Sequence, residues 1–147
     1  MHPKQKGFTL LEVLVAIVVL SIGLLGLAGL MATSMRNTHS AYQRTQAAWL
    51  AYDVIDRMRA NLPYVDAAPL PNDYDIALGT ATSASSSVLA AADINDWKTT
   101  LANALPAGDG SVTTTPATKR VTVIVQWNDT RGTGGSSTQK FQVDTQL

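Results

Sequence analysis

A single carboxylate, Glu12, stands at the edge of an almost wholly apolar run near the N-terminus. An ionised carboxylate in apolar surroundings is costly unless a positive partner neutralises it. The nearest cation that could be generated is a new α-amine, which Phe8 would carry if the chain were cut after Gly7. That amine, on this chain or on a neighbouring one, would turn an isolated charge into an ion pair.

The rest of the chain offers little catalytic chemistry. There is no cysteine, so disulfides, thiolate metal sites and thiol nucleophiles are excluded. His39 has no partner that the sequence can assign for nucleophilic catalysis, and there is no Gly-rich phosphate loop. The pairs Asp73/Asp75 and Asp93/Asp96 lack the ligand density of a calcium loop, which favours turn and cap roles for them. We therefore predict no enzyme activity, no cofactor and no metal.

The element that must position Glu12 is an apolar helix. Residues 13–32 carry no charge, and a helix of about 20 residues covers a hydrocarbon core of roughly 30 Å. Lys4 and Lys6 precede this run and Arg36 follows it, which weakly favours a cytoplasmic N-terminus and an exported remainder. A signal peptide or a plain anchor would share this hydropathy, but the small residues are dispersed through the run instead of following it. In a plain anchor, the head of Glu12 would reach water at the membrane edge.

The stretch "KGFTLLEVLVAIVVLSIGLLGL" resembles the class III signal of type IV pilins and of type II secretion pseudopilins. The match includes Gly7, Phe8 and Glu12 in order and spacing. The resemblance implies cleavage between Gly7 and Phe8 by a membrane prepilin peptidase, and N-methylation of Phe8. It also implies that Glu12 is an assembly residue, which pairs with a neighbouring N-terminus as a filament forms.

Beyond the apolar run, the pattern becomes amphipathic without a helix breaker until Pro63. We expect one continuous helix of about 54 residues, roughly 80 Å long. Apolar residues recur at offsets of three and four and should face the protein's own head: Ala47, Leu50, Ala51, Val54, Ile55, Met58 and Leu62. Asp53 and Arg57 are spaced for an ion pair, and exposed Trp49 and Tyr52 suggest contacts with neighbouring helices. Residues 44–63 resemble the ending of this helix in the PilV family of minor pilins.

The C-terminal part predicts a small mixed head. Residues 63–92 are rich in Pro, Ala and Ser and indicate a surface loop region. A short helix follows, with Asp93 as its N-cap and an apolar face formed by Ile94, Trp97, Leu101 and Leu105. We expect a turn at residues 108–110, and alternation around residues 121–127 and 141–147 predicts an antiparallel hairpin. The tripeptide at residues 128–130 fits an N-glycosylation pattern, but we interpret it as a turn.

These features together predict an α+β, pilin-like fold. We expect a leader at residues 1–7, a transmembrane and assembly helix at 8–32, its amphipathic continuation at 33–62, and a globular head at 63–147. At 147 residues the chain has room for one modest domain, and its net charge of zero, without a dense basic face, argues against direct nucleic-acid binding.

The resemblance implies a non-enzymatic minor pilin of a type IV pilus. Its partners would be other minor pilins, the major pilin, prepilin peptidase, an inner-membrane assembly platform and a tip adhesin. It would lie in the bacterial inner membrane with a periplasmic head, and afterwards in the pilus, at its tip. It would prime or cap assembly, and so serve adhesion, twitching motility or DNA uptake. Two alternatives remain open: a minor pseudopilin of a type II secretion system, and a membrane-anchored periplasmic binding module that never polymerises.

Overall fold

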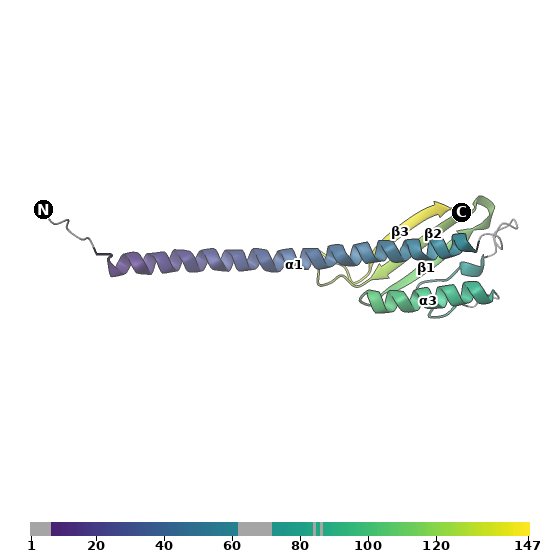
Figure 1. Cartoon of the computed structure of the whole chain (residues 1–147), viewed down its shortest axis with the longest axis horizontal. Coiled ribbons are helices and arrows are strands. Elements are labelled where there is room, and N and C mark those ends of the chain that lie inside the picture. The colour runs from purple at the N-terminus through teal and green to yellow at the C-terminus, as the bar shows by residue number, and fades with distance from the viewer. Residues whose placement is uncertain (1–6, 62–71, 84, 86) are drawn as a thin grey trace.

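The chain forms one very long helix with a small head packed along its C-terminal third (Figure 1). We describe a computed structural model of residues 7–61, 72–83, 85 and 87–147. The order of elements is α1 (Leu10–Ala60), η1 (Asn72–Tyr74), α3 (Val88–Ala104), β1 (Asp109–Thr115), η2 (Pro116–Thr118), β2 (Arg120–Trp127) and β3 (Gln139–Gln146). The α+β pilin-like fold predicted from the sequence is confirmed.

Helix α1 continues without interruption from the apolar run into the head. Its 51 residues correspond to about 77 Å. It ends at Ala60, where the N–H of the C-cap residue Asn61 donates to the carbonyls of Arg57 and Met58, both at 3.1 Å. The predicted stop at Leu62 and Pro63 lies outside the described residues, as do the basic leader residues before Gly7.

The amphipathic stripe of α1 packs against the head as predicted. Its buried members are Ala47, Ala51, Val54, Ile55 and Met58, with Leu50 partly buried beside them. On the other side Trp49 and Tyr52 are exposed, and Arg57 Nε lies 3.0 Å from Asp53 Oδ2. The large residues of α1 thus divide between a face that the head covers and a face that it leaves open.

Helix α3 begins six residues earlier than the sequence predicts. Its N-cap is Ser87, whose hydroxyl accepts from the N–H of Ala90, and not Asp93. The physical reason is that the extra turn is rich in alanine, a strong helix former, and that Ala90 is fully buried in the core. The predicted apolar face of α3, Ile94, Trp97, Leu101 and Leu105, is buried.

The sheet has three antiparallel strands in the order β1-β2-β3, not two. The β2–β3 hairpin is predicted by the sequence, but β1 is not. It begins inside the turn expected at residues 108–110 and continues through the residues that follow. The turn lies earlier, where the N–H of Gly108 donates to the carbonyl of Leu105. Strand β1 has one large apolar residue, Val112, and gains its stability from pairing along its whole length with β2.

The core lies between the sheet and the two helices. Helix α1 packs on β2 and β3, and α3 packs on β1 and α1. Trp97 Nε1 donates to the carbonyl of Leu50 at 2.7 Å, which joins α3 to α1. The segment predicted as a surface loop contributes to this core, because Tyr74 is buried and Ile76 forms a bridge with Val112.

Candidate assembly site at the start of the long helix

Residues 7–12 form the entry to α1. Thr9 is the N-cap, and its hydroxyl accepts from the N–H of Glu12 at 3.3 Å. Thr-x-x-Glu is the spacing of a capping box, and a carboxylate in the first turn is favoured by the positive end of the helix dipole. The backbone of Glu12 is therefore fixed in the first turn of the helix.

The Glu12 carboxylate has no partner in the described part of the chain. No hydrogen bond or ion pair to it is found there, and the residue is exposed. It borders a shallow groove on the side of α1, lined by Phe8, Glu12, Val13, Ala16, Ile17 and Leu20. Phe8 itself is 83% exposed. A carboxylate that could pair with a positive charge thus lies among exposed apolar side chains.

Gly7 is not required by the fold of this chain. A Cβ added to it would meet nothing within 4 Å, and its backbone does not adopt the left-handed conformation. A demand for a small residue here would therefore come from another molecule, such as the active site of a peptidase.

The apolar half of α1 is bare. The helix is long and apolar enough to cross a membrane by length and composition, and none of its most hydrophobic window is buried. Gly23, Gly26 and Gly29 lie in this half, each with open space where a Cβ would be. Only hydrocarbon or neighbouring helices could cover this surface without a cost.

The other candidate residues have structural partners. His39 Nε2 lies 2.9 Å from Gln43 Nε2. Asp75 accepts from both the N–H and the hydroxyl of Thr114, and Asp73 accepts from Ser85. Across the described ranges, no group of three or more His, Cys, Asp or Glu side chains could hold a metal ion.

Asp93 and Asp96 serve neither as caps nor as turn residues. Arg57 reaches them from α1, with its nitrogens 3.7 Å from Asp93 Oδ1 and 2.8 Å from Asp96 Oδ2. The sequence had assigned Arg57 to Asp53 alone. These pairs across two helices could not be found by spacing, because they join residues on different elements.

An ion pair links α3 to β1. Lys98 Nζ lies 2.5 Å from Asp109 Oδ1, and the lysine side chain is only 6% exposed. Burial opposes ionisation of Asp109, but the bonds from Lys98 and from the N–H of Gly79 outweigh it and lower the pKa of the carboxyl below its ordinary value.

Comparison with known proteins gave one match. A family model for the prokaryotic N-terminal methylation motif matches residues 2–28. The motif indicates a precursor of a type IV pilin-like protein or a pseudopilin, and proteins with this leader are structural proteins. Together with the long apolar helix, it fits a membrane-anchored pilin. No curated protein and no solved structure matches the chain, and the narrower resemblance to PilV gains no support.

Proposed function

We propose that this chain is a minor pilin of a type IV pilus, of the PilV kind, that primes or caps the filament. The observation that carries the proposal is the Glu12 carboxylate, which has no partner among the described residues and lies on a bare apolar helix. It is one helical turn from the bond between Gly7 and Phe8, where we expect cleavage. Adhesion, twitching motility or DNA uptake would then depend on it through the filament.

Processing would create the missing partner of Glu12. Hydrolysis of the bond between Gly7 and Phe8 leaves a carboxylate on Gly7 and an amine on Phe8, which is protonated at neutral pH. A methyl group on that nitrogen keeps it basic, so the positive charge persists. When two processed chains lie side by side, the Phe8 ammonium of one can meet the Glu12 carboxylate of the other.

This ion pair would fix the axial register between subunits. Breaking a buried pair by removing one partner costs about 3–5 kcal/mol, because the other charge is left unpaired. A subunit shifted by one helical turn would carry that cost, while the apolar side chains around Glu12 would tolerate the shift. The carboxylate therefore supplies specificity, and the apolar surface supplies affinity.

The proposed localisation follows from the same elements. Before assembly, α1 would hold the chain in the inner membrane with its head in the periplasm, where the assembly platform could extract it. The proposed partners are prepilin peptidase, the major pilin, other minor pilins and a tip adhesin.

Two experiments on cells that make this protein test the proposal. The first is mass spectrometry of sheared surface filaments, in which we expect the tryptic peptide from Phe8 to Arg36, one methyl heavier. An uncut N-terminus would overturn the proposal and favour the anchored binding module. The methylated peptide in membranes alone, with failed secretion on deletion, would favour a pseudopilin.

The second experiment separates processing from assembly. Gly7→Val should abolish cleavage, although a Cβ at this position would meet no atom within 4 Å. Glu12→Ala should be cleaved and inserted normally but lost from filaments. Ser21→Ala is the matched control, because the Ser21 hydroxyl only bonds to the carbonyl of Ile17 in its own helix. Wild-type filament content with Glu12→Ala would contradict the assembly role.

A further inference from the structure

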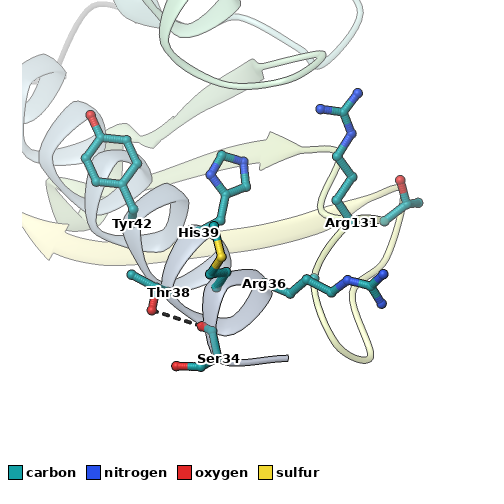
Figure 2. Close-up of a pocket in the computed structure, with 9 residues that line it drawn as sticks. Ser34, Arg36, Thr38, His39, Tyr42 and Arg131 are labelled. Atoms are coloured by element: carbon teal, nitrogen blue, oxygen red, sulfur yellow. Dashed lines mark hydrogen bonds between the residues drawn. The ribbon is translucent and has the colours of Figure 1, made fainter. Parts of the chain in front are cut away.

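An open cavity, lined by more apolar than polar surface, lies where α1 leaves its apolar half. The loop between β2 and β3 folds back along this part of the helix, and the space between them has a volume of about 1020 Å³ and opens to solvent. Arg36 and His39 come from the helix, and Thr130 and Arg131 come from the loop. Figure 2 shows Arg36 extending from α1 toward the loop from which Arg131 rises.

The loop is fastened in this position by a buried carboxylate. Asp129 is 1% exposed, and its Oδ2 accepts from the hydroxyl of Ser40 on α1 at 2.5 Å. Its own N–H donates to the carbonyl of Ser136, which closes the loop on itself. Gly135 packs so closely that a Cβ would lie 1.8 Å from the carbonyl oxygen of Asp129. These contacts hold the loop against α1, so that Arg131 lies beside the helix.

The cavity wall carries permanent positive charge. Arg36 and Arg131 are both exposed, and neither has a hydrogen bond or ion pair within the part of the chain that the structure describes. The carboxylate closest in sequence to Arg131 is Asp129, which is turned into the protein toward Ser40. A guanidinium group without a partner favours an anionic ligand, above all a phosphate, to which it donates paired hydrogen bonds.

The depth of the cavity points to the source of that phosphate. Arg36 lies four residues beyond Ala32, the end of the uncharged run, or about 6 Å along the helix axis. The headgroup layer on each side of a bilayer is about 5–7 Å thick. When the apolar run spans the membrane, Arg36 therefore lies at the level of the lipid phosphates. Met35, which is also exposed on the wall, offers an apolar surface to the first carbons of the acyl chains.

We propose that this cavity binds the phosphate of a phospholipid headgroup in the leaflet from which the head emerges. The proposal rests on the membrane insertion contained in the proposed function, and it goes beyond that function by assigning a ligand. A bound lipid would hold the head at a fixed depth and rotation against the membrane before assembly. Extraction of the chain into a filament would then require release of this lipid.

The test is lipid binding by the purified full-length chain in a detergent without phosphate. Native mass spectrometry would count adducts of phosphatidylglycerol, and of a diacylglycerol with the same acyl chains. We expect one tightly held phosphatidylglycerol per chain and no comparable diacylglycerol adduct. Arg36→Gln combined with Arg131→Gln should weaken the phosphatidylglycerol adduct about tenfold or more.

The matched control is Arg44→Gln combined with Lys140→Gln, which removes two exposed positive charges outside the cavity and should leave binding unchanged. Equal binding by the two double variants would overturn the proposal. Inorganic phosphate that binds as tightly as the lipid would overturn the assignment to a lipid. The filament experiments fail or succeed independently of this assay, so the two proposals can be told apart.

Discussion

At the scale of single residues, Tyr74 joins the end of α1 to α3. Its hydroxyl donates to Asp93 Oδ2 at 2.7 Å and accepts from Asn61 Nδ2 at 3.2 Å. The side chain is almost fully buried, and burial, together with the bond to Asp93, raises the pKa of Tyr74 to about 12. The folded state therefore disfavours the phenolate more strongly than the unfolded chain does.

This shift predicts a loss of stability at alkaline pH. Tyr74 ionises near pH 10 in the unfolded chain, so its contribution is complete below about pH 10 and is lost as the pH rises toward about 12. We expect the free energy of unfolding to fall by about 1–2 kcal/mol over this range. Urea denaturation of the full chain in detergent, followed by the tryptophan emission maximum, would measure it.

Tyr74→Phe should be less stable at neutral pH but should show a shallower alkaline decline. Tyr52→Phe is the matched control, because it removes the hydroxyl of an exposed tyrosine outside the core. An identical decline in Tyr74→Phe and in the wild type would show that other groups cause it.

At the scale of elements, α3 packs directly against β1 at Gly110. A Cβ on this residue would lie 2.4 Å from Trp97 Cη2 and 2.8 Å from Leu101 Cδ1. Both side chains are fully buried, so neither can move without disturbing the core. A residue without a side chain is therefore needed at position 110 for α3 to pack on β1.

Gly110→Ala should therefore destabilise the head by about 1–3 kcal/mol through overpacking. The urea midpoint of the full chain in detergent would report this loss. Thr113→Ala, at an exposed position of the same strand, should change stability much less. A Gly110→Ala variant as stable as the wild type would mean that α3 and β1 pack with more freedom than these distances allow.

At the scale of the whole molecule, the chain is divided into a bare half and a packed half. Every described residue from Gly7 to His39 is exposed, and burial begins only at Ser40 and Gln43. The core of the head therefore contains no side chain from the apolar half of α1. That half remains available to contact lipid or other subunits. On the proposed function, this division would let the chain keep the same head in a membrane and in a filament.

A fragment of residues 33–147 should consequently fold alone and remain soluble without detergent. We expect its urea midpoint to match that of the head in the full chain, because no core contact is removed. Near-UV circular dichroism and size-exclusion chromatography would test folding and monomeric state. Loss of the near-UV signal would show that the apolar half supports the head in a way that the contacts do not reveal.

The sequence by itself determined the features that arise from local periodicity. The continuous α1, its apolar stripe, the β2–β3 hairpin and the methylation motif around Gly7, Phe8 and Glu12 are all written in spacings of a few residues. Such patterns survive because neighbours on a helix or strand face are close in sequence. The roles of Gly7, Phe8 and Glu12 stay predictions until processing and assembly are measured.

Tertiary structure alone decided the features that depend on distant partners. Strand β1 has too little apolar alternation to be recognised, and it exists because β2 and the bridge at Ile76 pair with it. The early start of α3 needs the core that receives Ala90. The cavity at the membrane exit needs Asp129 to reach Ser40 across 89 residues of sequence. No local pattern encodes a contact at that separation, because only the folded chain brings its two partners together.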